Sequence, residues 1–219
     1  MVQSGFGPND QIPYTIDDLA DDIVELMNAL KIERACVVGM SLGGRIAQAA
    51  AMCHPQRITA LVSMMSTTGR PGLPPSTPAA MSVLVTSPRD PFDLEAVTEL
   101  AQSQQRIIGS PGYAMPDDYV RDVVALNFKR GNNPEGVLRQ LLVSGCAGDW
   151  RVRLSALNVP TFIMHGRDDP LIPFAAGEDC ARSIPGAKLL LIDGWGHNIP
   201  PLIGPLLARE MTAFFDEIL

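Results

Sequence analysis

A serine between glycines is the residue of this chain whose type and surroundings most clearly predict covalent chemistry. Ser41 lies in the stretch GMSLG (39–43), with an apolar, strand-like run before it and a helix-like segment of small residues after it. In that context the glycines allow a tight strand-to-helix turn whose strained geometry projects the serine oxygen toward a substrate. We therefore predict that Ser41 is a nucleophile and that the N–H of Leu42, at the helix start, faces a developing oxyanion.

A phosphate-binding loop is the alternative interpretation of glycines that follow a strand. Such a loop needs a lysine after its second glycine. Gly44 and Arg45 occupy those positions, so the sequence favours the nucleophile.

A serine hydroxyl needs a positioned base, and the chain has three histidines. His54 lies at a helix end before a proline and His165 ends a strand, so we expect structural roles for both. His197 lies in DGWGHNIP, a glycine-rich loop after the last predicted strand. Open α/β sheets place their chemistry at the carboxyl ends of the strands, which such a loop can reach. We predict that His197 is the base; a surface loop histidine is the alternative.

The base needs a carboxylate that fixes its tautomer and stabilises the imidazolium. Asp168 and Asp169 both follow a strand in HGRDDPLIP, and spacing alone does not choose between them, since either one could simply form a turn. Asp193 and Asp149 are weaker candidates. The predicted chain order is Ser, Asp, His, which differs from the chymotrypsin and subtilisin orders.

Composition narrows the class of protein. A chain of 219 residues with 46% apolar content can bury one core, with or without a lid. A net charge of −7 without a basic stripe argues against a nucleic-acid partner. The sequence shows no signal-peptide pattern and no long apolar run, so we expect no membrane span and a cytoplasmic location. The four cysteines are widely spaced, which predicts reduced thiols and no structural zinc. We expect no cofactor and no metal.

The segments that position these residues alternate between strand-like and helix-like patterns. A capping box, Thr15 with Asp18, starts a predicted helix that reaches Leu30. Strands are predicted at 35–40, 58–65, 159–166 and 187–193, and helices at 43–52, 174–183 and 203–218. From Gly69 the chain becomes a proline-rich loop and then helical near 93–107, 116–130 and 134–145. The predicted fold class is α/β: a mostly parallel sheet with helices on both faces, formed by 1–69 and 151–219, and a helical cap at 70–150.

Three stretches together resemble the α/β-hydrolase fold family: VVGMSLGG, VPTFIMHGRDDPLIP and IPGAKLLLIDGWGHNIP. The chain most resembles cap-bearing esterases of the aclacinomycin methylesterase type, and SGFG (4–7) resembles the loop that precedes that family's helix before the nucleophile turn. The resemblance implies that the acid is Asp169, three residues after Gly166 and four before Pro173. It also implies a serine hydrolase that cleaves a small carboxylic ester. Lactonases, perhydrolases and carbon–carbon bond hydrolases share this triad, and the sequence does not separate them.

The predicted cap carries apolar side chains that suggest a substrate with a hydrophobic group, although packing within the cap is the alternative. These residues are Met81, Leu84, Val85, Phe92, Tyr113 and Met115.

The chain departs from this family before the nucleophile. Only forty residues precede Ser41, and they supply a loop and one helix instead of sheet strands and a His-Gly oxyanion turn. We therefore expect an N-terminally incomplete fold, slow turnover unless another N–H supplies the second oxyanion donor, and a strand at 35–40 with an unpaired edge that favours self-association. A second hypothesis follows: a truncated or inactive hydrolase-fold protein that acts as a binding or interaction module.

Overall fold

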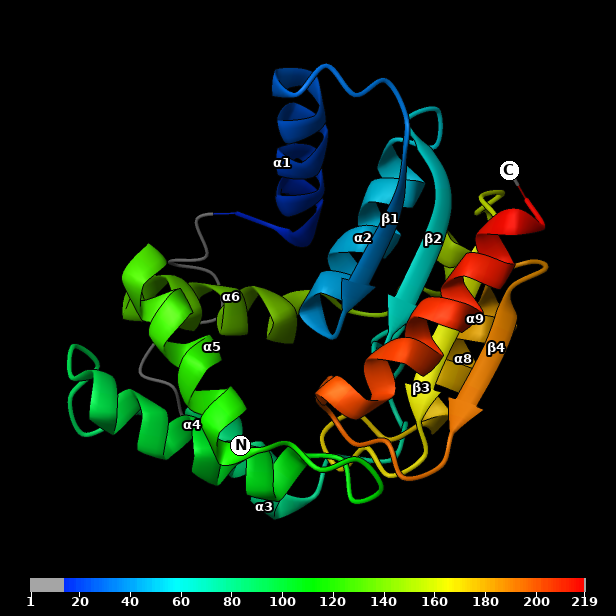
Figure 1. Cartoon of the computed structure of the whole chain (residues 1–219). Helices are drawn as coiled ribbons and strands as arrows, with labels where there is room; N and C mark the ends of the chain where they lie inside the picture. Colours follow the sequence, from blue (N-terminus) through cyan, green and yellow to red (C-terminus); the bar gives the residue numbers. More distant parts are fainter. Residues whose placement is uncertain (1–13, 219) are drawn as a thin grey trace.

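Four parallel strands in the order β1-β2-β3-β4 form the sheet of the computed structural model, which describes residues 14–218 (Figure 1). The strands are β1 (Ala35–Met40), β2 (Ile58–Met64), β3 (Thr161–Gly166) and β4 (Lys188–Ile192). Helix α1 (Ile16–Ala29) precedes β1, α2 (Leu42–Cys53) follows it, α8 (Ala175–Ser183) joins β3 to β4, and the 3₁₀ turn η1 (Pro201–Ile203) leads into α9 (Gly204–Asp216). Parallel strands joined by helices confirm the predicted α/β class.

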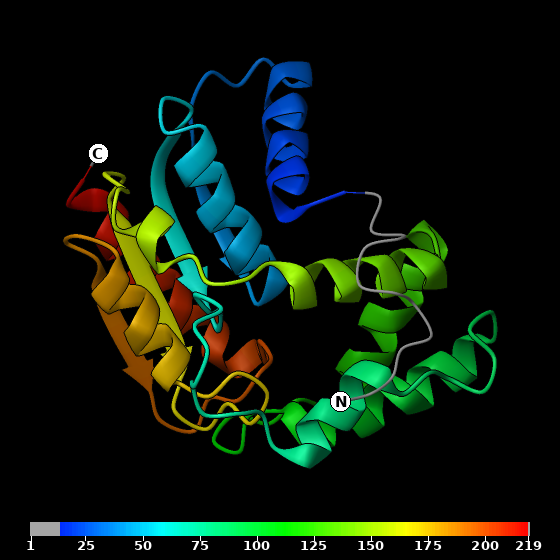
Figure 2. The ribbon, with the colours of Figure 1, turned by 180° about the vertical axis from the view of Figure 1, so that it is seen from behind.

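Helices cover both faces of this sheet. On one face, α2 and α8 pack on the strands and α1 packs on α2, burying one apolar cluster (Figure 2). On the other face lies α9, whose Phe214 contacts Phe162 of β3 and lies close to Lys188 of β4. The predicted capping box is present at Thr15, which fixes the start of α1. The two helical layers bury an apolar cluster on each face of the sheet.

Strand β1 is an edge strand, as its position in the sequence predicted. Its covered face contacts α2, but Val38 on the opposite face is 48% exposed. The predicted helical cover on both faces of the sheet is therefore incomplete at β1. The physical reason is that α9 crosses β3 and β4, so that on this face of β1 Cys36 and Met40 are only partly buried and Val38 is exposed (Figure 1).

Five helices lie between β2 and β3: α3 (Pro78–Val85), α4 (Leu94–Ile108), α5 (Asp117–Arg130), α6 (Pro134–Cys146) and α7 (Arg151–Leu154). Helices α4, α5 and α6 match the predicted ones closely. The proline-rich loop predicted between Gly69 and the helix near 93–107 instead contains α3, because Thr77 caps this helix by accepting the Ala80 N–H and a proline opens its first turn. Helices α3 and α4 lie beyond the carboxyl ends of the strands (Figure 1). The assignment of 70–150 as a cap stays a prediction.

Two further properties bear on the class of protein. All four cysteines lie among the described residues and none forms a disulfide bond, which agrees with the predicted reduced thiols. None of the helices found in 14–218 combines the length and the apolar content that a membrane span needs.

Candidate active site

Ser41 lies at the sharp turn between β1 and α2. Its backbone has φ 56° and ψ −120°, a left-handed conformation that is strained for a residue with a side chain. The Ser41 N–H donates to the carbonyl of Met64 at 2.8 Å, which anchors the turn to β2. A Cβ added to Gly39 would lie 2.0 Å from the Gly43 carbonyl oxygen, so the backbone approach that forms the turn requires glycine at 39.

The second glycine of the motif is less constrained than the pattern suggests. A Cβ at Gly43 would meet nothing within 4 Å, whereas one at Gly44 would lie 2.7 Å from the Cβ of Ser66. Gly44 is therefore the position where α2 packs closely on the segment after β2. In the sequence, Gly44 argued only against a phosphate loop, and this packing role carries no local signal there.

The structure brings Ser41, His197 and Asp169 together. Nε2 of His197 lies 2.9 Å from Oγ of Ser41, and Nδ1 of His197 lies 2.7 Å from Oδ2 of Asp169. His197 is 5% exposed and Asp169 is also 5% exposed. Because a carboxylate can only accept, Nδ1 carries the proton and Nε2 is left free to accept the proton of the serine hydroxyl.

Asp169 is held as an ionised acceptor. Burial by itself would raise the pKa of Asp169, but hydrogen bonds from His165 and His197 and from the Ile172 N–H outweigh it and bring the pKa below its ordinary value. Oδ1 accepts the N–H groups of Leu171 and Ile172 at 2.9 and 2.8 Å. The carboxylate therefore has a fixed orientation in which Oδ2 alone faces the imidazole.

His165 lies behind the carboxylate and is fully buried. Its Nε2 donates to the carbonyl of Ile172 at 2.8 Å and lies 3.5 Å from Oδ2 of Asp169. A Cβ added to Gly177 would lie 2.5 Å from Nδ1 of His165, so α8 packs directly on the ring. The structural role predicted for His165 is consistent with these contacts, and its support of Asp169 is a feature that the sequence did not reveal.

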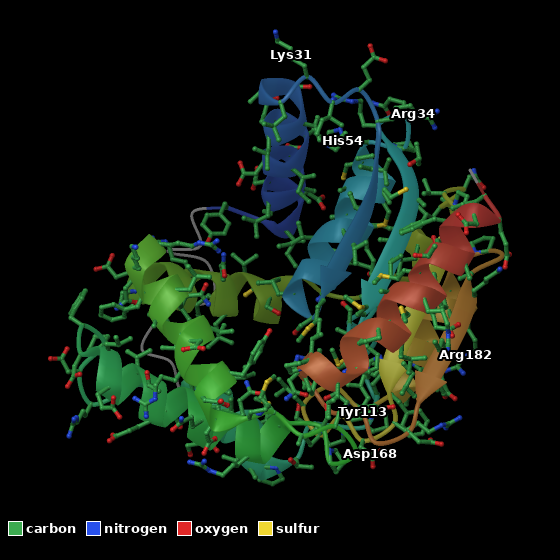
Figure 3. The ribbon with its side chains drawn as sticks, viewed as in Figure 1. Lys31, Arg34, His54, Tyr113, Asp168 and Arg182 are labelled. Atoms are coloured by element: carbon green, nitrogen blue, oxygen red, sulfur yellow. The ribbon has the colours of Figure 1, made fainter. Side chains whose placement is uncertain are left out.

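The other candidate side chains have different partners. Asp168 accepts the N–H of Gly194 through Oδ2 at 2.7 Å, so it stabilises the loop that carries His197. Asp193 and Asp149 form exposed ion pairs with arginines. His54 pairs with a surface aspartate and lies at the opposite end of the sheet from Asp168 (Figure 3). None of these four side chains takes part in the contact between Ser41 and the imidazole of His197.

Leu42 is the first residue of α2, so its N–H has no acceptor within the helix and lies at the positive end of the helix dipole. The stretch SGFG (4–7), which precedes the predicted first helix, lies outside the described residues. Among residues 14–218, no group of three His, Cys, Asp or Glu side chains is arranged to hold a metal ion. The arrangement places a serine hydroxyl, an imidazole and an oriented carboxylate in series, which are the groups that acyl transfer requires.

Comparison with known proteins gives a family match over most of the chain. The model of the alpha/beta hydrolase fold family matches residues 3–201. Rhodomycin D methylesterase of a Streptomyces species is 24% identical, in an alignment that covers 92% of this chain and 73% of the relative. The 2-hydroxy-6-oxononadienedioate/2-hydroxy-6-oxononatrienedioate hydrolase of Cupriavidus pinatubonensis is 27% identical over 78% of this chain. The present chain spans only 58% of that second relative.

Solved structures agree on the fold. A meta-cleavage product hydrolase from Pseudomonas fluorescens superposes with a TM-score of 0.69 at 23% sequence identity. The superposition covers 96% of this chain and 74% of that one. This similarity extends over the sheet and over the helices between β2 and β3.

Proposed function

Since the chain belongs to the α/β-hydrolase fold family, we propose that it is a serine hydrolase that cleaves a small carboxylic ester through an acyl-enzyme. The observation that carries the proposal is the continuous contact from Ser41 through His197 to Asp169. A surface serine beside a histidine would need neither the strained backbone at 41 nor a buried carboxylate behind the imidazole.

In the proposed mechanism, Oγ of Ser41 attacks the ester carbonyl carbon while Nε2 of His197 removes the hydroxyl proton. Asp169 stabilises the imidazolium and keeps its orientation. The N–H of Leu42 donates to the oxyanion of the tetrahedral intermediate. His197 then protonates the departing alcohol, and the acyl group stays on Ser41. A water molecule then attacks the acyl carbonyl carbon while His197 takes its proton. When the bond between that carbon and Oγ of Ser41 breaks, His197 returns the proton to Oγ and the carboxylic acid leaves.

The substrate that we propose carries a hydrophobic group. Support comes from the segment between β2 and β3, which we propose as a cap: Met81, Val85 and Phe92 are exposed apolar side chains in or near its first helix. A relative named for methylester cleavage supports an ester, while the relative named as a dienedioate hydrolase leaves carbon–carbon bond cleavage as the alternative within this class. Lactonase and perhydrolase activities are further alternatives within this class, and assays on the corresponding substrates distinguish them.

Unpaired cysteines support a cytoplasmic location for the protein.

Labelling with a fluorophosphonate tests the nucleophile. We expect the wild-type protein to be labelled at Ser41 and the Ser41→Ala variant to be unlabelled. Hydrolysis of a short-chain aryl ester, abolished in His197→Ala, tests the base. Unchanged labelling of Ser41→Ala would exclude the mechanism. A folded wild-type protein without labelling or hydrolysis would favour the inactive binding module.

We propose in addition that this chain self-associates through β1. The outer edge of β1 has no partner strand among the described residues, and Val38 of this strand is half exposed. Unpaired edges with apolar faces favour pairing with another chain. Sedimentation velocity tests this proposal, and a stable monomer over a wide concentration range would contradict it.

A further inference from the structure

The loop that carries His197 is held from outside by the end of α4. The His197 N–H donates to the carbonyl of Ile108, the last residue of α4, at 2.7 Å. A second backbone bond joins the Gly112 N–H to the Gly194 carbonyl at 2.8 Å. A Cβ at Gly196 would lie 2.2 Å from the Gly109 carbonyl oxygen, so the two segments are in direct backbone contact.

Side chains add a directed chain of hydrogen bonds to this contact. The Gly196 N–H donates to Oγ of Ser110 at 3.0 Å, and the Ser110 hydroxyl donates to Oδ1 of Asn198. Nδ2 of Asn198 donates to Oε1 of Gln105, on α4, at 2.7 Å. Each hydroxyl and amide atom named here has a complementary partner, so the amide of Asn198 has one favoured orientation. We call Gln105, Ser110 and Asn198 the amide bridge.

The amide bridge acts on the residues on either side of the imidazole. Gly196, which precedes His197, donates to Ser110 of the bridge, and Asn198, which follows His197, is itself a member of the bridge. Gly194 and Gly196 give the loop a backbone with large conformational freedom in the absence of such contacts. Asn198 is 4% exposed, so loss of its partners would leave buried polar atoms unsatisfied and would displace the loop.

We propose that Asn198, anchored to α4 by Gln105, is a positioning residue that holds His197 at Ser41. The inference rests on the proposed function, because it assigns to the amide bridge a role in the same proton transfer. The segment between β2 and β3 thereby controls the base as well as the substrate. A displacement of about 1 Å in a reacting group can reduce turnover by up to about 10²-fold.

Gln105→Leu tests the bridge, because leucine has a similar size and no acceptor for Nδ2 of Asn198. We expect kcat to fall about tenfold with an unchanged KM, after normalisation to the concentration of active sites. Both Gln105 and Asn198 also line an open cleft of about 490 Å³, which is why KM must be measured beside kcat. Gln105→Glu keeps an acceptor at the same place and should restore kcat to within about twofold.

The adjacent residue provides a matched control. Gln104 lies on the same helix and donates to the Val83 carbonyl at 3.0 Å, away from the histidine loop. Gln104→Leu also removes one side-chain hydrogen bond from α4, so we expect a similar loss of thermal stability and kcat within about twofold of wild type. Equal losses of kcat in Gln104→Leu and Gln105→Leu would overturn the proposal.

A spectroscopic measurement separates this inference from the proposed function. The proton on Nδ1 of His197, buried and bonded to Asp169 at 2.7 Å, should give a far-downfield proton resonance that exchanges slowly with water. We expect the resonance to broaden in Gln105→Leu and to persist in Gln104→Leu and Gln105→Glu. If the wild-type protein shows no hydrolysis, this pattern still supports positioning while the proposed function fails. An unchanged resonance in Gln105→Leu, or none in the wild type, would overturn the inference.

Discussion

Replacement of Asp169 by asparagine tests whether the carboxylate sets the tautomer of His197. Oδ1 of Asp169 accepts two backbone N–H groups, from Leu171 and Ile172, and Oδ2 accepts Nδ1 of His197. In Asp169→Asn the amide oxygen will take the position of Oδ1, because only an acceptor satisfies both N–H groups. The amide NH₂ then faces Nδ1, so the imidazole proton must lie on Nε2. That nitrogen can no longer remove the proton of Ser41.

The size of the effect follows from the same contacts. The productive orientation requires a flipped amide whose NH₂ faces two backbone donors, leaving both unsatisfied. Each unsatisfied buried donor costs about 1–3 kcal/mol, so the flip costs about 2–6 kcal/mol. At about 1.4 kcal/mol per factor of ten, the productive fraction is about 1 in 30 at most and about 1 in 2 × 10⁴ at least. Variants of Ser-His-Asp triads with the wrong tautomer lose about 10⁴-fold in kcat, which lies within this range.

The assay is kcat on a short-chain aryl ester together with the rate of fluorophosphonate labelling, each normalised to folded protein. Asp168→Asn is the matched control: Asp168 accepts one N–H, from Gly194, and the asparagine carbonyl can accept the same group. We expect this control to keep kcat within about threefold. The reasoning is refuted if Asp169→Asn keeps more than about one thirtieth of kcat, or if Asp168→Asn loses as much.

Three further predictions concern stability and association. Gly39→Ala places a Cβ 2.0 Å from the Gly43 carbonyl oxygen, so we expect the free energy of unfolding to fall by about 3 kcal/mol or more and fluorophosphonate labelling to be lost. In the control Gly43→Ala, the added Cβ meets no atom within 4 Å, and the free energy of unfolding should change by under about 1 kcal/mol. Chemical denaturation measures both changes. The pKa of Asp169 is lowered in the fold from 3.8, so its ionised form stabilises the protein above about pH 4, and this contribution is lost as pH falls through the lowered pKa. Thermal unfolding between about pH 6 and pH 2 should therefore decline less steeply in Asp169→Asn than in wild type, and parallel declines would contradict the assignment. Val38→Lys places a charge on the exposed position of β1. We expect the sedimentation coefficient at high protein concentration to fall from that of an associated wild-type protein to that of a monomer. A wild-type protein that is itself monomeric at that concentration would contradict this prediction.

The main elements of the fold were predictable because the apolar patterns are local. The buried runs at 35–40 and 58–65 and the helical periodicity of 93–107 correspond to β1, β2 and α4. Helix α3 was missed because its start signal, Thr77 with a following proline, lies among other prolines that indicate a loop. The exposed face of β1 was missed because the coverage of a strand depends on where a distant helix crosses the sheet.

The candidate site was predictable in part for the same reason. Ser41 and His197 follow strands in distinctive local patterns, and the structure places them in contact. The local pattern did not choose between Asp168 and Asp169, because two adjacent aspartates in a turn differ only in the direction of their side chains. The carboxylate of Asp168 faces the Gly194 N–H, and that of Asp169 faces the imidazole of His197. The amide bridge was not predictable, since its Gln105–Asn198 bond joins residues 93 positions apart.

The large separation of Ser41 and His197 along the chain has a consequence for biosynthesis. The turn at Ser41 is complete once β2 has emerged, but the imidazole that it contacts follows 156 residues after the serine. At about 5–20 residues per second, a ribosome needs roughly 8–30 s to add that length. During this interval the nascent chain carries a serine without a base, and an unassisted hydroxyl is a weak nucleophile. The order of the elements therefore delays the contact between Ser41 and His197, and with it the proposed acylation, until β4 and its loop have been synthesised and have docked on the sheet.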